Sequence, residues 1–136
     1  MDRVFLDANV LFSAAYSAEN GLLKLWELAK NNSNVTFVTS AYALAEAERN
    51  VISSEHGARL HTLIKSVEIV ETMPPQLLPK EVAVHDKDKP ILLAAISAKA
   101  THLLTGDFKH FGKYYGMTIT GIIILPPAEY LRKYTK

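Results

Sequence analysis

The sequence lacks cysteine, long apolar runs and any strong net charge, and each absence narrows the class of protein. Without cysteine there is neither a disulfide scaffold nor a zinc site built on thiolates, which is compatible with the cytoplasm. No apolar run approaches the roughly 20 residues needed to span a bilayer. A net charge of +1 over 136 residues gives no overall basic field, so nucleic acid would have to be bound by a local patch. Because Met1 to Arg3 lead directly into an apolar run, we expect no signal peptide and a cytoplasmic protein.

Several familiar active-site motifs are missing as well. We find no Walker loop, no GxGxxG turn, no GxSxG nucleophile elbow and no repeated Asp-rich calcium loop. The histidines do not have the spacing of a metal-binding motif such as HExxH. These histidines are His56, His61, His85, His102 and His110. The acidic residues are therefore the remaining source of chemistry.

Short apolar runs alternate with helical patterns along the chain. The runs that predict buried strands are residues 4–6, 35–38, 67–70, 103–104 and 122–125. Helical spacing and capping residues predict helices over 8–16, 22–30, from a cap at Thr39 or Ser40 to about residue 51, over 54–66, 76–84 and 90–100, and from Pro126-Pro127 onward. This alternation predicts one α/β domain over residues 1–136, a three-layer α/β/α sandwich with a mainly parallel, five-stranded sheet.

Four acidic residues lie where such a fold would bring them to one edge of the sheet. Asp7 and Asp107 each follow a predicted strand, and the binding crevice of a parallel sheet lies outside the carboxyl ends of its strands. Asp88 opens a predicted helix, and Glu46 lies inside another. Converging carboxylates repel by roughly 4 kcal/mol per pair at about 4 Å and an effective dielectric near 20. Such a cluster needs protons or cations to persist, and a divalent metal is the usual solution.

Each of these acids also has a purely structural interpretation. Asp7 can cap the helix that follows it, and Asp88 can cap a helix with Pro90 in its first turn. Asp107 can cap a turn through residues 108–111. A cap and a metal ligand are compatible, because one carboxylate oxygen can serve each purpose.

The glutamate position is open between two neighbours. Glu46 is surrounded by small alanine side chains that would let its helix approach the sheet closely, but exposed helix glutamates are common. Glu48 lies about 200° away around the helix, so the two residues cannot face the same site.

Taken together, these motifs resemble those of the PIN-domain nucleases, and the resemblance covers almost the whole chain. It implies a five-stranded parallel sheet and a ribonuclease site that depends on Mg²⁺ or Mn²⁺. Small members of the family are often VapC-type toxins, so it also implies RNA as the substrate, an antitoxin as a partner and a homodimer. The segments that carry the resemblance are Phe5-Leu6-Asp7-Ala8-Asn9, the helix around Glu46, residues 88–96, residues 103–111 and the closing residues 123–131.

The resemblance assigns the family's acidic positions to Asp7, Glu46, Asp88 and Asp107. We expect Asp7 and Asp107 to bind the principal ion, which could lower the pKa of a bound water and present hydroxide to the phosphorus. Asp88 and Glu46 would hold a second ion or order the attacking water. Oxygen ligands of this kind suit Mg²⁺.

Other residues near the motifs have supporting roles under the same resemblance. Asn9 and Thr105 would orient the ligands from behind, and Asp86 would substitute for Asp88 or support it. Basic side chains beside the acids would hold flanking phosphates, unless they form a solvated loop over core aromatics. These substrate residues are Lys87, Lys89, Lys109, His110 and Lys113, with Tyr114 and Tyr115 as stacking partners and Phe108 and Phe111 as packing residues.

The leading hypothesis is therefore a metal-dependent endoribonuclease that hydrolyses RNA phosphodiester bonds, as the toxin of a toxin–antitoxin pair. The alternative is a nuclease-inactive PIN-like module that binds RNA or protein. A phosphatase of the haloacid dehalogenase type is disfavoured, because the sequence after the first strand is Asp7-Ala8-Asn9 and not the expected DxD.

Overall fold

The computed structural model describes residues 1–71 and 86–133, so the helix expected over residues 76–84 lies outside the described residues. The strands are β1 (Asp2–Leu6), β2 (Val35–Ser40), β3 (Glu68–Val70), β4 (His102–Leu104), β5 (Thr118–Ile119) and β6 (Ile122–Leu125). The helices are α1 (Ala8–Ala14), α2 (Leu23–Asn31), α3 (Ala41–Arg49), α4 (Ser54–Ile64), α5 (Lys89–Ser97), α6 (Phe108–Phe111) and α7 (Pro127–Arg132), with 3-10 turns η2 (Asp86–Asp88) and η3 (Gly112–Tyr114). Within these ranges, none of the helices has the length and apolar character needed to cross a membrane.

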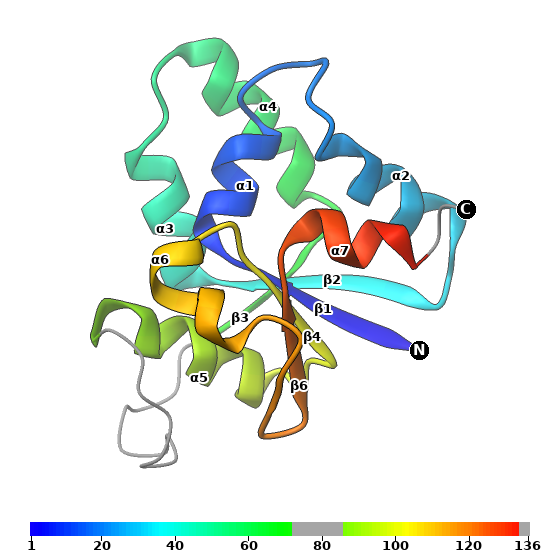
Figure 1. Cartoon of the computed structure of the whole chain (residues 1–136). Coiled ribbons are helices and arrows are strands. Elements are labelled where there is room, and N and C mark those ends of the chain that lie inside the picture. The colour runs from blue at the N-terminus through cyan, green and yellow to red at the C-terminus, as the bar shows by residue number, and fades with distance from the viewer. Residues whose placement is uncertain (72–85, 134–136) are drawn as a thin grey trace.

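The strands form one sheet in the order β3-β2-β1-β4-β6-β5. All neighbouring pairs are parallel except β5 and β6, which are antiparallel. Helix α5 covers one face of the sheet, while α1, α2 and α4 lie on the other (Figure 1). The predicted three-layer α/β/α sandwich with a mainly parallel sheet is confirmed.

The expected number of five strands is wrong by one, because β5 adds a short sixth strand to the sheet. Strand β5 pairs with β6 through Ile119 and Ile122, which leaves Thr120 and Gly121 as a two-residue loop. Both loop residues have positive φ, at 49° for Thr120 and 85° for Gly121, as a type I′ turn requires. Threonine is an unusual residue for the first position of this turn, so the sequence carries only a weak hairpin signal there.

The two central strands are the most deeply buried part of the sheet. Phe5 and Leu6 of β1 and Leu103 and Leu104 of β4 are fully buried. Their apolar character on both faces follows from the helices that cover both sides of the sheet. These strands therefore form a rigid base for the residues that follow them.

The end of β1 is fixed by the strand beside it. The hydroxyl of Thr39 donates a hydrogen bond of 2.9 Å to the carbonyl oxygen of Leu6. The next residue, Ser40, caps α3 by accepting a hydrogen bond of 3.0 Å from the amide of Ala43. Of the two residues predicted as the cap, Ser40 has that position, while Thr39 anchors the neighbouring strand.

The order of the strands reverses between β1 and β4. From β1 the chain proceeds to β2 and β3 on one side, and then returns to β4 and β6 on the other. Leu6 lies opposite Leu104 in the register, and the amide of Asp7 donates a hydrogen bond of 3.0 Å to the carbonyl oxygen of Leu104. Open α/β sheets form their binding crevice at such a switch point. The topology therefore brings the residues after β1 and β4 to the place where a ligand site is expected.

Candidate metal centre

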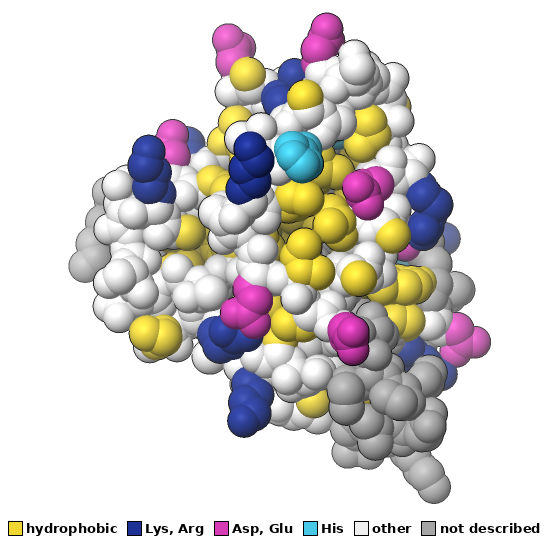
Figure 2. All heavy atoms as spheres, turned by 180° about the vertical axis from the view of Figure 1, so that it is seen from behind, with side chains coloured by type: hydrophobic (Ala, Val, Ile, Leu, Met, Phe, Trp, Pro, Cys, Tyr) yellow, Lys and Arg dark blue, Asp and Glu magenta, His cyan; other side chains and the backbone are white. Residues whose placement is uncertain are grey.

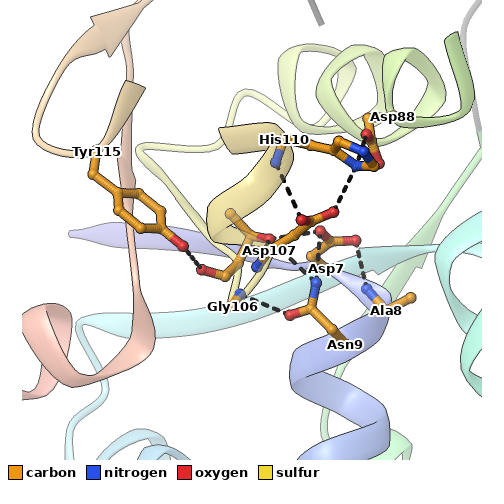
Figure 3. A network of polar contacts seen from close by, with 9 residues as sticks. Asp7, Ala8, Asn9, Asp88, Gly106, Asp107, His110 and Tyr115 are labelled. Carbon is orange, nitrogen blue, oxygen red and sulfur yellow. Dashed lines mark hydrogen bonds and ion pairs between the residues drawn. The ribbon is translucent and has the colours of Figure 1, made fainter. Parts of the chain in front are cut away.

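Asp7 is a buried carboxylate whose two oxygens have different partners. Its side chain is only 3% exposed. Oδ1 accepts a hydrogen bond of 2.7 Å from the amide of Ala8 at the start of α1. Oδ2 accepts hydrogen bonds from the Thr105 hydroxyl at 2.8 Å and from the Asn9 amide group at 3.2 Å. The structural interpretation as a helix cap is thus correct for one oxygen, while the other belongs to a polar network (Figure 3).

Asn9 and Thr105 connect this network to the loop after β4. The Thr105 hydroxyl accepts hydrogen bonds from Asn9 Nδ2 at 3.2 Å and from the amide of Asp107 at 3.1 Å. Asn9 Oδ1 accepts a further hydrogen bond of 2.7 Å from the amide of Gly106. A Cβ atom at Gly106 would lie 3.2 Å from that oxygen, so glycine permits the close approach of Asn9. Asn9 and Thr105 therefore lie directly beside Asp7, as expected of residues that orient it.

The pKa of Asp7 reports the electrostatics of the site. Burial is the main cause that raises this pKa from 3.8 to about 6, and the hydrogen bonds from Thr105 and Ala8 oppose the shift. The negative charges of Asp88 and Glu46 raise the pKa further. Both carboxylates must lie near enough to Asp7 for their charges to act on it, although they come from separate elements. Asp7, Asp88 and Glu46 thus share one electrostatic environment at the edge of the sheet.

Asp88 and Asp107 meet at the imidazole of His110. Nδ1 of His110 lies 2.8 Å from Oδ2 of Asp88 and 2.8 Å from Oδ2 of Asp107. Oδ1 of Asp107 accepts a hydrogen bond of 3.2 Å from the amide of His110, which caps α6. Figure 3 shows the ring between the two carboxylates. One ligand atom from each of the three residues fits within a group whose members are no more than 4.8 Å apart, a spacing that a metal ion can bridge.

Asp88 occupies the predicted cap position of α5, but its side chain does not cap the helix. Asp88 is the N-cap residue of α5, and Pro90 lies in the first turn as expected. Its carboxylate makes no capping hydrogen bond to the described amides of α5. With 6% of its surface exposed, Asp88 instead directs Oδ2 toward His110. A buried carboxylate that does not cap its own helix is available to the site.

The two glutamates of α3 lie in different environments. Glu46 is half-buried and acts electrostatically on Asp7. Glu48 is exposed and lines a groove between α3 and α4 together with Val51, Leu60 and Ile64. Acidic side chains also lie around the hydrophobic side chains on the face opposite to that of Figure 1, as Figure 2 shows. Of the two glutamates, Glu46 is thus the half-buried one whose charge acts on Asp7, which favours it over Glu48 as the site residue.

Sequence reasoning did not find the position of His110 in the cluster. We expected it as a substrate contact, and the spacing of the histidines shows no metal motif. A signal was nevertheless present, because His110 follows Asp107 by three residues and two such residues share one side of a helix. Its other neighbour, Asp88, lies far away in sequence, so only the fold reveals the trio.

The acidic residues of this site lie within a segment that matches a known protein family. The family model described as PIN domain matches residues 3–109, which include all four acids. The chain belongs to the PIN-domain family. The comparison with curated proteins finds no match.

Solved structures share the fold of this PIN domain at low sequence identity. The structure of VapBC2 from Rickettsia felis, bound to a DNA fragment from its promoter, has a TM-score of 0.65 at 22% identity, over 91% of this chain and 98% of that one. VapBC-1 from nontypeable Haemophilus influenzae has a TM-score of 0.58 at 16% identity, over 93% and 98%. Mycobacterium tuberculosis VapC20, a sarcin–ricin loop cleaving toxin, has a TM-score of 0.52 at 16% identity, over 78% and 92%. This PIN domain is thus similar in fold to proteins of the VapBC systems.

The basic residues expected to contact substrate differ in their surroundings. Lys109 and Lys113 are exposed on α6 and η3, and Nζ of Lys113 lies 5.2 Å from the centroid of the Tyr114 ring. Nζ of Lys89 lies 2.8 Å from Oδ1 of Asp86, whose side chain is 90% exposed. The side chain of Lys87 is outside the described part of the chain. Two lysines, Lys109 and Lys113, are therefore both exposed and close in sequence to Asp107.

The aromatic residues of this segment correct one expectation. Phe111 is fully buried as predicted, but Phe108 is 74% exposed, so its interpretation as a packing residue is wrong. The Phe108 ring covers Gly112, where a Cβ atom would lie only 2.7 Å from it. The hydroxyl of Tyr115 donates a hydrogen bond of 2.7 Å to the carbonyl oxygen of Thr105, and burial raises its pKa. Tyr115 thus supports the loop after β4, while Phe108 presents an aromatic ring to solvent.

The donor atoms of the PIN domain fit a divalent cation. Carboxylate oxygens are preferred ligands of Mg²⁺ and Mn²⁺, and an imidazole nitrogen is compatible with the transition metals. The raised pKa of Asp7 shows that its negative charge is poorly stabilised where it lies. A cation beside Asp7, Asp88 and Asp107 would offset this cost, because the neighbouring charges would then be neutralised.

Proposed function

We propose that this protein is a metal-dependent endoribonuclease that hydrolyses RNA phosphodiester bonds. The observation that carries the proposal is the position of the buried Asp7 after β1, beside the loop after β4, together with the cluster of Asp88 and Asp107 around His110, at the switch point of a PIN-domain sheet. Acids in such a place stabilise the fold poorly, because burial penalises their charges. A bound cation would offset this unfavourable free energy, and it would also serve a site that acts on a phosphate.

The proposed roles divide between the acids and the residues behind them. Asp7, Glu46, Asp88 and Asp107 hold Mg²⁺ or Mn²⁺, which supplies Lewis-acid polarisation of the phosphodiester and acidification of water. The chain's own contribution is to fix these carboxylates before substrate arrives. Asn9 orients Asp7, and Thr105 links Asp7 to the loop after β4.

The proposed substrate surface lies on α6 and η3. Lys109 and Lys113 supply positive charge for the phosphates on either side of the scissile bond. The exposed ring of Phe108 offers a stacking surface for an unpaired base, and base–aromatic stacking contributes about 1–3 kcal/mol per base. A single-stranded or looped RNA suits this combination, because a base stacked on Phe108 has to be unpaired.

The similarity in fold to VapBC proteins supports a role as the toxin of a toxin–antitoxin pair. On this proposal a protein antitoxin binds the chain and suppresses its activity. The cytoplasmic location, the homodimer and the assignment of residues 1–136 to a single nuclease domain stay predictions of the sequence.

The direct test is cleavage of a set of structured and single-stranded RNAs in Mg²⁺ or Mn²⁺. We expect Asp7→Asn and Asp107→Asn to lower the rate by about a hundredfold or more, because each removes a charged ligand. Helix α3 offers a matched pair: Glu46→Gln should lose activity, whereas Glu48→Gln, on the exposed side, should retain it. Unchanged cleavage in both aspartate variants would refute the mechanism. RNA binding without metal and without turnover would support the nuclease-inactive binding module instead.

A further inference from the structure

We propose that His110 is a nitrogen ligand of the ion held by Asp88 and Asp107, and that it biases the site toward transition metals and away from Mg²⁺. This inference rests on the proposed function, since it concerns the same site. It assigns to this PIN domain a mixed donor set in which two carboxylate oxygens and one imidazole nitrogen face a common point.

The distances between the donor atoms suit a shared ion. Neighbouring ligands of an octahedral ion with bonds of about 2.1 Å lie about 3.0 Å apart. Nδ1 of His110 lies 2.8 Å from Oδ2 of Asp88 and 2.8 Å from Oδ2 of Asp107. The same atom therefore faces both carboxylates at nearly the separation that coordination requires. Small movements of the three side chains would suffice to admit an ion.

The imidazole of His110 is held in position between two elements of the fold. The backbone amide of His110 donates to Oδ1 of Asp107, so the same carboxylate caps α6 with one oxygen and faces the ring with the other. The spacing of three residues on α6 places both side chains on one side of the helix. Asp88 approaches from η2, at the start of α5. The nitrogen is thus positioned by two separate elements, as a ligand has to be if it is to contribute to selectivity.

The imidazole nitrogen changes which cations the donor set prefers. Mg²⁺ is a hard cation that binds oxygen and retains several waters, so an imidazole adds little to its binding. Imidazole suits transition metals, whose affinity for a given nitrogen and oxygen site rises from Mn²⁺ toward Co²⁺ and Ni²⁺. Two carboxylates and a neutral imidazole also balance the charge of a divalent ion. The presence of His110 should therefore strengthen the binding of Co²⁺ more than that of Mg²⁺.

The test compares the binding of Mg²⁺, Mn²⁺ and Co²⁺ to the wild-type protein and to His110→Gln by calorimetry, without RNA. We expect the variant to lose about tenfold or more in affinity for Co²⁺ and less than about threefold for Mg²⁺. In the Mn²⁺-loaded wild type, electron spin echo modulation should reveal a directly bound ¹⁴N nucleus, and His110→Gln should abolish this signal. His61→Gln is the matched control, because that histidine is exposed on α4 and should affect neither result.

Two outcomes would overturn the inference. Equal losses for all three ions, without a ¹⁴N signal in the wild type, would show that His110 only supports the carboxylates. A gain in Mg²⁺ affinity in His110→Gln would show that the ring competes with the ion.

Two controls accompany this test. Urea unfolding of the metal-free variant checks that the fold is retained, and Asp88→Asn should weaken the binding of all three ions whatever the role of His110. The nuclease proposal is tested separately, by the RNA cleavage of Asp7→Asn. Because metal binding is measured without RNA, its result does not depend on whether the protein cleaves RNA.

Discussion

Replacement of Asp7 by asparagine tests whether the charge of this buried carboxylate destabilises the folded protein. Asp7 is a buried carboxylate whose pKa is raised to about 6, mainly by burial and further by the charges of Asp88 and Glu46. A raised pKa means that the folded protein holds the proton more tightly than the unfolded chain. The stabilisation associated with the protonated form is complete below pH 3.8 and is lost as the pH rises through about 6. Asp7→Asn stays neutral throughout this range, so it is free of this pH dependence.

The magnitude follows from the shift of the pKa. At 1.36 kcal/mol per pKa unit, the rise from 3.8 to about 6 corresponds to about 3 kcal/mol in full. Integration between pH 5 and pH 8 leaves about 1.4 kcal/mol to be lost in that window. The free energy of unfolding of the wild type, relative to the variant, should therefore fall by about 1.4 kcal/mol from pH 5 to pH 8.

Urea unfolding at the two pH values, in the presence of a chelator, measures this change. The comparison between two proteins removes contributions from other groups, such as His102, whose pKa is lowered by burial and whose effect on stability has the opposite sign. Because the hydrogen bonds lost in Asp7→Asn lower its free energy of unfolding equally at both pH values, their effect also cancels. Glu48→Gln, at an exposed position, gives the baseline for a carboxylate removed from the surface. Addition of Mg²⁺ at pH 8 should stabilise the wild type more than Asp7→Asn. A difference between Asp7→Asn and the wild type that does not change with pH would refute the electrostatic argument.

Two further substitutions test the residues beside the acids. Thr105→Val removes the hydroxyl that donates to Asp7 and accepts from Asp107, so the free energy of unfolding at pH 8 should fall by about 1–3 kcal/mol; a loss below about 0.5 kcal/mol would contradict the network. Phe108→Ala should leave stability within about 0.5 kcal/mol because the ring is exposed, yet weaken RNA binding about tenfold when measured in an Asp107→Asn background; unchanged affinity would show that the ring does not contact RNA.

The sequence predicts best those features that depend on neighbouring residues. Continuous apolar runs identify β1 and β4 as buried strands, and the carboxyl ends of these strands place Asp7 and Asp107 at the same edge. Ser40 has the side chain and position of a helix cap, and it caps α3 as expected. Local sequence is sufficient for the strands and for the cap, and the parallel topology that the alternation of strands and helices implies brings Asp7 and Asp107 together although they are far apart in sequence.

Individual side-chain contacts between distant residues, and a strand too short for a pattern, were not predicted. The carboxylate of Asp88 has every local sign of a cap but faces His110, because α6 folds back against the start of α5. Strand β5 contains two residues, too few for a periodic pattern, and its turn requires positive φ at Thr120. Phe108 has an apolar side chain, and only the orientation of α6 exposes it. Tertiary contacts and not propensity determine each of these outcomes.

The pairing of β1 with β4 also determines when the site can form during synthesis. Roughly 100 residues separate Asp7 from Asp107, and at translation rates of about 5–20 residues per second they emerge roughly 5–20 s apart. Until β4 emerges, the edge of β1 on that side has no strand to pair with, and the loop that carries Thr105 and Asp107 does not yet exist. Nascent or prematurely terminated chains without β4 therefore lack Thr105 and Asp107 and cannot assemble the complete acidic cluster. The strand order therefore delays assembly of the acidic cluster until nearly the whole fold has been made.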